Sequence, residues 1–246
     1  MDRVAVVTGA GRGLGEAVAR LFADNQISVS LCDIDRSRVD GVADEMRSHG
    51  ANVESFGLDV AIPDECDELV GGTIRRFGGV DILVNCAAIC PRITIEDMTE
   101  EHYDRIMSVN LKSVFFLSRA AGEAMKARGW GRIVNVSSIG GRTGGIFAAT
   151  VYSASKAGII SMTKAFARHY APHGILVNCI APGSIDTQLM RDLTPQELQQ
   201  TIDGVALKRL AEPRETARVV LFLASEHASY MTGTTVDVNG GALMPD

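Results

Sequence analysis

Tyr152 and Lys156 stand four residues apart in the stretch 151–156, a spacing that could move a proton. On a helix, residues i and i+4 share one face, so a phenol and an ammonium would be neighbours. A free phenol titrates near pH ~10, and a nearby cation favours the phenolate. Lowering that pKa by roughly three units is worth about 4 kcal/mol of differential stabilisation. We interpret Tyr152 as a general acid/base and Lys156 as the cation beside it, with a simple helix-surface pair as the alternative.

Two further polar residues are candidates to act with Tyr152. Ser138 stands at the end of an apolar run, residues 133–136, fourteen residues before Tyr152, and the adjacent Ser137 is an alternative to it. Asn110 is expected in the middle of a helix over residues 103–128, on a largely apolar face. An Asn in such a position usually makes buried hydrogen bonds and often distorts the helix by competing with the backbone.

A glycine-rich segment follows the first apolar run, residues 4–8. It does not match the dinucleotide fingerprint G-x-G-x-x-G but fits Thr8-Gly9-x-x-x-Gly13-x-Gly15. Glycines let the backbone approach a pyrophosphate closely, and a helix that begins there presents its unpaired N–H groups and the positive end of its dipole. The segment therefore predicts a dinucleotide-binding turn.

Asp33 ends the second apolar run, eighteen residues beyond Gly15. An acid about 20 residues after such a turn binds the hydroxyls of an adenosine ribose and repels a 2′-phosphate. We therefore expect NAD rather than NADP, although Arg12, Arg36 and Arg38 are nearby cations that could accommodate a phosphate. The alternative is that Asp33 only caps the next helix.

Strands and helices alternate along the chain. Apolar β-branched runs predict seven strands, over residues 4–8, 28–32, 53–58, 81–86, 132–137, 175–180 and 235–238. Helical periodicity predicts helices between them, over residues 39–46, 63–77, 103–128, 151–170 and 214–224, with another directly after the glycine turn. This order predicts the α/β class: one domain, residues 1–246, with a Rossmann-like, doubly wound, mostly parallel seven-stranded sheet and helices on both faces. Ligands bind such sheets beyond the carboxyl ends of the strands, where most of the singled-out residues fall.

Composition limits the function classes. The 246 residues are 46% hydrophobic and 22% charged, typical of a globular protein, and a net charge of −6 without a basic cluster argues against nucleic-acid binding. No signal-peptide core or bilayer-spanning run occurs, so we expect a cytoplasmic protein that does not bind membranes. The five cysteines (32, 66, 86, 90 and 179) show no C-x-x-C pair and are expected to be reduced structural thiols. No His or Cys spacing is typical of a metal site, and we expect no metal.

Together these motifs resemble the short-chain dehydrogenase/reductase (SDR) family over the whole chain. The matching pieces are Thr8-Gly9-Ala10-Gly11-Arg12-Gly13-Leu14-Gly15, Asp59-Val60, Asn85-Cys86-Ala87-Ala88, Val109-Asn110, Ser137-Ser138, Tyr152-x-x-x-Lys156 and Pro182-Gly183. The resemblance implies a catalytic tetrad in which Tyr152 exchanges a proton with the substrate oxygen and Ser138 hydrogen-bonds that oxygen. In it, Lys156 lowers the Tyr152 pKa and holds the nicotinamide ribose, while Asn110 positions a water in a proton relay.

The resemblance also implies a cofactor site and an assembly. The implied dinucleotide-binding residues are Gly9, Arg12, Gly13, Leu14, Gly15, Asp33, Asp59, Val60, Asn85, Tyr152, Lys156, Pro182, Gly183, Ile185 and Thr187. Two departures from the family pattern are Ala88, where the family usually has Gly, and an interval from Ser138 to Tyr152 that is one residue longer than in many members. The family implies a homotetramer built through the helices over residues 103–128 and 151–170.

The substrate is a small-molecule alcohol or ketone in this interpretation. Candidate pocket residues lie at 89–92, 139–147 and 184–190, and the polar, irregular segment 184–207 is expected to be a lid over the pocket. Arg92 and Arg142 are the charged residues among them that could bind an anionic substrate group, beside Ser138 and Tyr152. The alternative is that both are solvated loop residues.

Three functions remain open. The first is an NAD-dependent oxidoreductase that interconverts a secondary alcohol and its ketone by direct hydride transfer. The second is a 3-oxoacyl-[acyl-carrier-protein] reductase using NADPH, for which Lys126, Arg128 and Arg132 form a partial basic patch. The third is a dinucleotide-sensing regulator without catalysis, which the presence of all four tetrad residues disfavours.

Overall fold

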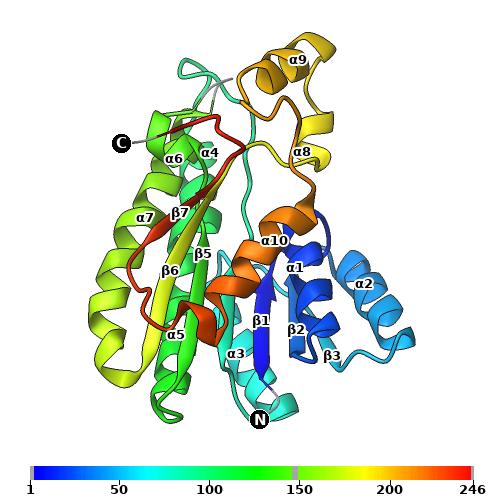
Figure 1. Ribbon diagram of the computed structural model, residues 1–246, viewed down its shortest axis with the longest axis vertical. Helices are drawn as coiled ribbons and strands as arrows, with labels where there is room; N and C mark the ends of the chain where they lie inside the picture. The colour runs from blue at the N-terminus through cyan, green and yellow to red at the C-terminus, as the bar shows by residue number, and fades with distance from the viewer. Residues whose placement is uncertain (1–2, 146–148, 245–246) are drawn as a thin grey trace.

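A seven-stranded sheet forms the centre of the protein in the computed structural model, which describes residues 3–145 and 149–244 (Figure 1). The strand order is β3-β2-β1-β4-β5-β6-β7, and all pairs in this order are parallel. The strands are β1 Val4–Thr8, β2 Ser28–Asp33, β3 Val53–Gly57, β4 Ile82–Asn85, β5 Gly131–Val136, β6 Ile175–Pro182 and β7 Thr235–Val238. The predicted fold class is confirmed, and the predicted strands differ from these by at most two residues at either end.

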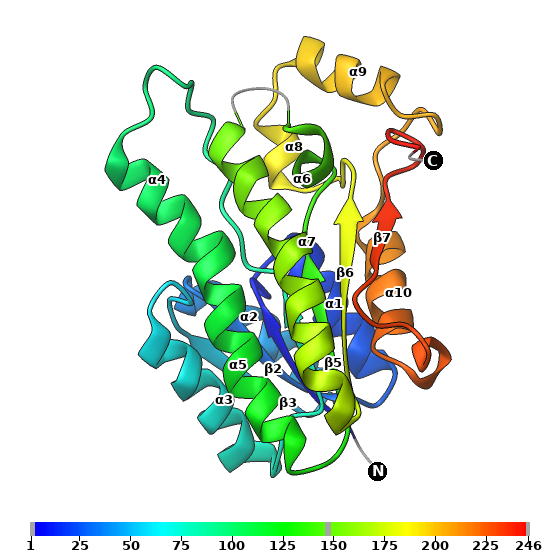
Figure 2. The same cartoon turned by 90° about the vertical axis from the view of Figure 1, so that its left-hand side faces the viewer.

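Helices cover both faces of the sheet (Figure 2). One face packs against α1 Gly13–Asp24, α2 Arg36–Ser48 and α10 Pro213–Leu223. The other packs against α3 Pro63–Phe77, α5 Ser113–Lys126 and α7 Thr150–Tyr170. Because both faces are covered, all five residues of β1 are buried, which explains why its sequence is a continuous apolar run and not an alternating one.

The strand register brings the ends of neighbouring strands to one edge. Thr8 pairs with Cys32, Asn85 with Asn135, and Val136 with Ile180. The residues that follow β1, β2, β4, β5 and β6 therefore gather beyond the same edge, where the parallel sheet offers a ligand site.

The helix predicted over residues 103–128 is divided in the structure. It consists of α4 Glu100–Met107, a π-helical turn Ser108–Lys112, and α5. The expectation that Asn110 distorts the helix is confirmed, since Asn110 is the middle residue of the π-helical turn and is fully buried. Such turns are common at functional sites because they re-aim the backbone.

Residues 184–207, expected to be irregular, contain two short helices, α8 Gln188–Arg191 and α9 Pro195–Asp203. Thr194 and Glu197 form a capping box at the start of α9. A further short helix, α6 Gly140–Thr143, follows β5. Within the described residues, no helix is long and apolar enough to cross a membrane.

Candidate active site

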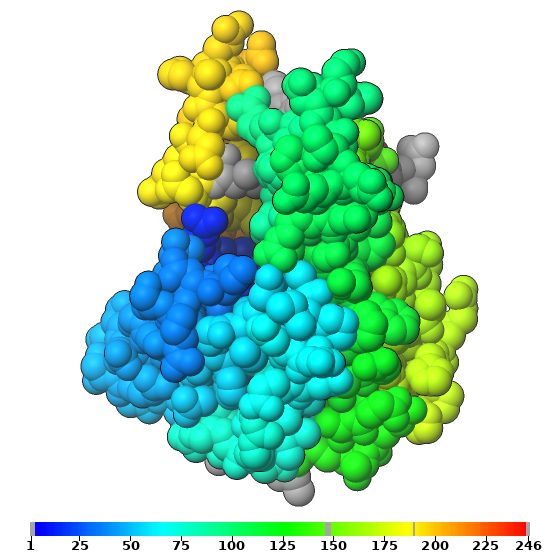
Figure 3. All heavy atoms as spheres, turned by 180° about the vertical axis from the view of Figure 1, so that it is seen from behind, coloured from blue at the N-terminus to red at the C-terminus, as the bar shows by residue number. Residues whose placement is uncertain are grey.

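A pocket of about 1220 Å³ lies beyond the carboxyl edge of the sheet. In Figure 3 the surface is hollowed between the segment carrying α8 and α9 (yellow) and the region of α4 (green), above residues near the start of the chain (blue). The predicted site residues that line the pocket are Gly9, Arg12, Gly13, Leu14, Gly15, Asp33, Asp59, Val60, Ser138, Tyr152, Lys156, Pro182, Gly183, Ile185 and Thr187. Asn85, Asn110, Arg92 and Arg142 are outside this lining.

The glycine turn forms the floor of the pocket. Gly9 and Gly13 have φ angles of 65° and 60°, in the left-handed region that favours glycine. A Cβ on Gly15 would lie 2.1 Å from the carbonyl oxygen of Gly9, so only a glycine lets α1 start so close to β1. Arg12 stands at the N-cap of α1 without a capping side-chain hydrogen bond. The N–H groups of the first turn are thus available to a pyrophosphate, and the turn fits a dinucleotide.

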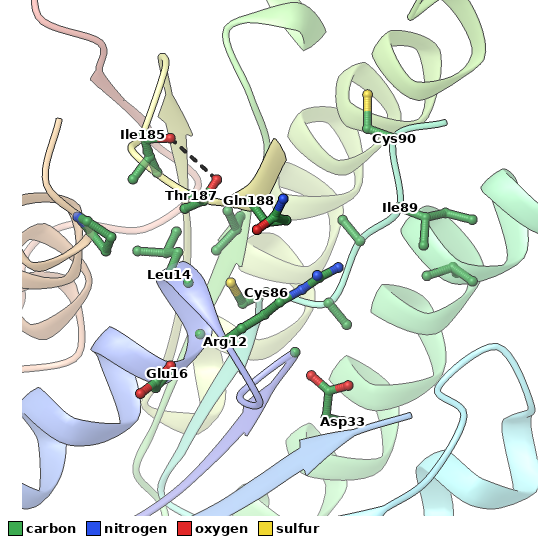
Figure 4. Close-up of a pocket in the computed structure, with 18 of the residues that line it drawn as sticks. Arg12, Leu14, Glu16, Asp33, Cys86, Ile89, Cys90, Ile185, Thr187 and Gln188 are labelled. Carbon is green, nitrogen blue, oxygen red and sulfur yellow. Dashed lines mark hydrogen bonds between the residues drawn. The ribbon is translucent and has the colours of Figure 1, made fainter. Parts of the chain in front are cut away.

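Asp33 closes one end of the pocket and is tied to the glycine turn. Its Oδ2 accepts a hydrogen bond from Gly11 N at 3.0 Å, and its Oδ1 accepts one from Asp35 N at 3.0 Å. Figure 4 shows the Arg12 side chain extending from the glycine turn across the pocket, with Asp33 drawn below it. The other two nearby cations have acidic neighbours, since Arg36 pairs with Asp40 and Arg38 with Asp35.

Asp59 lines the pocket beside Val60 and carries two contacts of its own. Its Oδ2 accepts a hydrogen bond from Arg105 Nη1 at 2.8 Å, and its Oδ1 accepts one from Ala61 N at 2.9 Å. Arg105 also lines the pocket, although the sequence did not single it out. These bonds hold the loop after β3 against α4.

Asn85 does not lie in the pocket lining, in contrast to the role that the resemblance implies for it. Its side chain is buried on the face covered by α5 and α7, where Nδ2 donates to Asn135 Oδ1 at 2.8 Å and to Ser118 Oγ at 3.1 Å. Asn135 Nδ2 in turn donates to Thr163 Oγ1. Asn85 thus joins β4 and β5 to the two helices, and any dinucleotide contact would have to come from its backbone.

Tyr152 and Ser138 meet in the pocket. Tyr152 lies in the first turn of α7, and Ser138 follows β5. Burial raises the pKa of Tyr152, and a hydrogen bond with the Ser138 hydroxyl opposes this rise. Ser137 is buried and donates elsewhere, to the backbone oxygen of Lys156. Ser138, and not Ser137, is therefore the hydroxyl that shares a ligand position with Tyr152.

Lys156 is almost completely buried behind Tyr152. Its Nζ donates a hydrogen bond to the Val136 carbonyl oxygen at 2.8 Å and lies 5.6 Å from the centroid of the Tyr152 ring. Burial lowers the pKa of Lys156 to about 8, because a low-dielectric environment disfavours the ammonium.

The expected lowering of the Tyr152 pKa is not met in the protein alone. Burial raises the pKa of Tyr152 to about 12, and Ser138 is the group that opposes this rise. The helical spacing correctly places the ammonium near the phenol, but a buried phenolate is so poorly solvated that desolvation outweighs this proximity. In the protein without ligands the Tyr152 phenol is therefore protonated near neutral pH, the form that can donate a proton.

Asn110 is bonded to the wall of the pocket and to the helix that carries Tyr152. Its Nδ2 donates to the Ile89 carbonyl oxygen at 2.9 Å and to Ser155 Oγ at 3.2 Å, so both amide hydrogens are used. Ser155 Oγ donates to the Tyr152 carbonyl oxygen at 2.6 Å. The Asn110 side chain therefore has no N–H left to donate to a water.

The two candidate anion-binding residues are directed to other partners. The Arg92 guanidinium forms an ion pair with Glu197 on α9, and Arg142 Nε lies 2.8 Å from Asp237 Oδ1 on β7. Neither side chain lines the pocket. The geometry gives no support to an anionic substrate group at either residue.

The candidate segment 139–147 lies only partly within the described residues, which exclude 146–148.

Uncharged side chains from two segments line the pocket, together with the charged residues Asp186, Arg191 and Asp192 of the segment after β6. Figure 4 shows Ile89 and Cys90 on the segment after β4, across the pocket from Gln188 and Thr187 on the segment after β6. All five cysteines are free, and Cys86 and Cys90 line the pocket, which their interpretation as structural thiols did not foresee. Burial raises the pKa of the Cys86 thiol to about 11 and also raises that of Cys90, so both are protonated at neutral pH. No group of three or more metal-ligating side chains occurs within the described ranges.

Comparison with known proteins agrees with this geometry. A family model described as Enoyl-(Acyl carrier protein) reductase matches residues 9–242. The chain is 40% identical to 3-oxoacyl-[acyl-carrier-protein] reductase FabG of Vibrio cholerae over 242 residues, 98% of each protein. It is 35% identical to acetoacetyl-CoA reductase of Allochromatium vinosum over 249 residues, 99% of this chain and 100% of that protein. The crystal structure of gox2181 matches with a TM-score of 0.93 and 34% identity, covering 98% of this chain and 95% of the other.

The doubly wound sheet and the Ser138, Tyr152 and Lys156 site define an oxidoreductase that works with a nicotinamide dinucleotide. With the family match and these relatives, the chain belongs to the short-chain dehydrogenase/reductase family.

Proposed function

We propose that this protein interconverts a secondary alcohol and its ketone with NAD as the preferred cofactor and Tyr152 as the general acid/base. The observation that carries the proposal is the meeting of Ser138, Tyr152 and Lys156 in the same pocket as the glycine turn and Asp33. A dinucleotide that lies on the turn with its adenosine at Asp33 would have its other end near Tyr152.

Each residue has a part in the chemistry. When bound, the dinucleotide supplies or accepts the hydride at the reacting carbon. In ketone reduction Tyr152 donates its phenolic proton to the carbonyl oxygen, and in alcohol oxidation the phenolate removes that proton. Ser138 donates a hydrogen bond to the same oxygen and stabilises the charge that develops on it. Lys156 places a positive charge behind the phenol, which assists its ionisation.

The preference for NAD is supported by Asp33. Its carboxylate is fixed by Gly11 and Asp35 at the end of the pocket, where an adenosine ribose would lie. A 2′-phosphate there would meet a like charge, which disfavours NADP. Arg12, at the same end, is the residue that could offset this repulsion.

A second candidate is a reductase of 3-oxoacyl thioesters, favoured by two relatives named as 3-oxoacyl-[acyl-carrier-protein] reductase and acetoacetyl-CoA reductase. Both candidates use the same proton transfer at Tyr152 and differ in what lies next to the carbonyl. The uncharged walls formed by Ile89, Cys90 and Met190 suit an acyl chain as well as a neutral alcohol.

The test is a matrix of initial rates with NAD and NADP over neutral secondary alcohols, polyols, hydroxy acids and 3-hydroxyacyl thioesters, with the reverse reactions in NADH and NADPH. Preference for NAD with a simple alcohol supports the first candidate. Preference for NADPH with 3-oxoacyl thioesters supports the second and would show that Arg12 outweighs Asp33. Dinucleotide binding without turnover of any substrate would contradict both and favour a dinucleotide-sensing regulator.

We also propose a homotetramer built through α5 and α7. Phe115 on α5 is 43% exposed, and its ring centroid lies 5.4 Å from that of Phe116 and 5.6 Å from that of Phe166 on α7. An exposed aromatic group across two helices is typical of a surface that is buried on association. Light scattering should give four times the chain mass for the wild type and a lower mass for Phe115→Asp, but not for Ile74→Asp on α3. A monomeric wild type contradicts the proposal.

A further inference from the structure

Ser137 has no part in the proposed chemistry, yet its side chain contacts the catalytic helix. Its Oγ donates a hydrogen bond to the Lys156 carbonyl oxygen at 2.8 Å, and both residues are almost completely buried, at 3% and 2% exposure. The Lys156 carbonyl lies inside α7, so it does not need this bond to satisfy the helix. The Ser137 hydroxyl is therefore an extra donor to this carbonyl, and it constrains the backbone of Lys156 itself.

The ammonium group of Lys156 is also bound at the end of β5, next to Ser137. Its Nζ donates to the carbonyl oxygen of Val136, the residue directly before Ser137, at 2.8 Å. Lys156 is thus bonded at both ends to the end of β5, through its ammonium at Val136 and through its backbone at Ser137. A flexible four-carbon side chain held in this way can reach only a small volume.

A third contact fixes the backbone of Lys156 from another side. Gly141 in α6 lies so close that a Cβ built on it would be 2.8 Å from the Lys156 carbonyl carbon and 3.0 Å from the carbonyl oxygen. Gly141 N in turn donates to the Ser138 carbonyl oxygen at 3.0 Å. The segment that carries Ser138 is therefore packed against the same peptide group that Ser137 binds.

We propose that Ser137 is a positioning residue that holds Lys156 at the depth from which its ammonium reaches both Val136 and the Tyr152 ring. Ser137 is among the residues that line the pocket, but its hydroxyl is directed to the Lys156 carbonyl oxygen, and in this role it acts through Lys156. The proposal rests on the proposed function only in assigning Lys156 a catalytic part; the placement of the ammonium by Ser137 is a property of the protein without ligands.

The test is an NMR titration of Lys156 Nζ in protein with isotope-labelled lysine, assigned by comparison with Lys156→Met. In Ser137→Ala the ammonium is less tightly held and moves toward water, so its pKa should rise by about half a unit or more toward the ordinary value. Ser137→Thr keeps the hydroxyl and should restore the wild-type titration. Ser137→Cys, a weaker donor of similar size, should lie between them, and it also serves if Ser137→Ala does not fold.

Ser30→Ala is the matched control. Ser30 on β2 is also fully buried and hydrogen-bonded, accepting from Thr73 Oγ1 at 2.8 Å, but it lies outside the pocket lining. Its loss should lower the melting temperature and leave the Lys156 titration unchanged. An unchanged titration in Ser137→Ala, or an equal change in Ser30→Ala, would overturn the proposal.

Kinetics then connect the positioning to turnover. With a substrate from the rate matrix, Ser137→Ala should lower kcat about tenfold with little change in KM, because small displacements of a catalytic group are costly to the chemical step. The pH dependence of kcat should move with the Lys156 titration. A wild type without turnover would contradict the proposed function, and the NMR titration, which needs no ligand, would still decide the role of Ser137.

Discussion

The side chain of Asn110 and the backbone of Ile89 exchange two hydrogen bonds, one in each direction. Ile89 N donates to Asn110 Oδ1, and Asn110 Nδ2 donates to the Ile89 carbonyl oxygen, each at 2.9 Å. The two residues belong to the π-helical turn before α5 and to the segment after β4 that lines the pocket. Asn110 thereby fixes the pocket wall, and through Ser155 it also fixes the first turn of α7.

Asn110→Asp should be nearly as damaging as Asn110→Ala, although it changes a single atom. The aspartate keeps an acceptor for Ile89 N but places a second oxygen against the Ile89 carbonyl, so one hydrogen bond becomes a repulsion in a buried site. We expect each variant to lower kcat/KM by at least about tenfold and to speed hydrogen exchange at the Ile89 amide. An Asp variant with wild-type kinetics and exchange would contradict this account of the pocket wall.

The stability of the protein should depend on Lys156 in alkaline solution. The folded-state pKa is lowered to about 8, so between pH 8 and the ordinary value of 10.5 the unfolded chain binds a proton that the folded protein does not. Stability due to this residue therefore rises with pH. We expect the free energy of unfolding of the wild type, relative to Lys156→Met, to increase by about 2–3 kcal/mol from pH 7 to 10.

Urea unfolding of the two proteins at several pH values measures this difference. Using the difference cancels the opposite effect of buried thiols that do not interact with Lys156, such as Cys32 and Cys66, whose pKa values are raised by burial and which therefore lower stability as pH rises. If the two curves remain parallel between pH 7 and 10, the Lys156 ammonium is not desolvated as the structure describes.

Replacing Asp33 by Asn should shift the cofactor preference. The charge that repels a 2′-phosphate is removed, and we expect the ratio of kcat/KM for NAD over NADP to fall by about tenfold or more. One acceptor for Gly11 or Asp35 is lost as well, so KM for both cofactors should rise. Asp35→Asn, two residues away and outside the pocket lining, removes an equal charge and is the control. If the NAD over NADP ratio changed equally in Asp33→Asn and Asp35→Asn, only the overall negative charge near the site would matter, and not the position of Asp33.

The ion pair between Arg92 and Glu197 joins the segment after β4 to α9. Glu197 also accepts from Thr194, so we choose Glu197→Gln, which can keep the capping box while removing the charge. Arg92→Ala, Glu197→Gln and the double variant should each change the substrate KM by at most about fivefold, with the double variant no worse than the worse single one. Hydrogen bonds from Arg92 and from Thr194 lower the pKa of Glu197 to about 2, so the coupling should persist at pH 4. Additive effects would show that the pair does not act as a unit.

The sequence predicted those parts of the site that depend on local geometry. Tyr152 and Lys156 were found from helical spacing, and Ser138 and Asp33 from their places after strands, because these rules hold wherever a parallel sheet is doubly wound. The positions of Arg92 and Arg142 depend on Glu197 and Asp237, about a hundred residues further on, which no local pattern reveals.

The structure differs from the sequence-based prediction at two other residues, Asn85 and Tyr152, again because the outcome depends on tertiary packing. The family resemblance implies a cofactor contact for Asn85, but its side chain lies among Ser118, Asn135 and Thr163, because tertiary packing decides which face of a strand looks into the core. The direction of the Tyr152 pKa depends on how much water the fold removes, and spacing alone gives only the partner charge. The role of Ser155 could have been suspected, because it stands three residues after Tyr152 within the same helical turn.

The most direct test of the central claim, that Tyr152 is the acid/base of a hydride transfer, is a single-turnover experiment with NADH carrying deuterium at its transferable position. The wild type should deliver the deuterium to the carbinol carbon of the product, and Tyr152→Phe should lose at least about a thousandfold in rate while keeping its affinity for NADH. Transfer at an undiminished rate in Tyr152→Phe would contradict the account, as would wild-type product without deuterium.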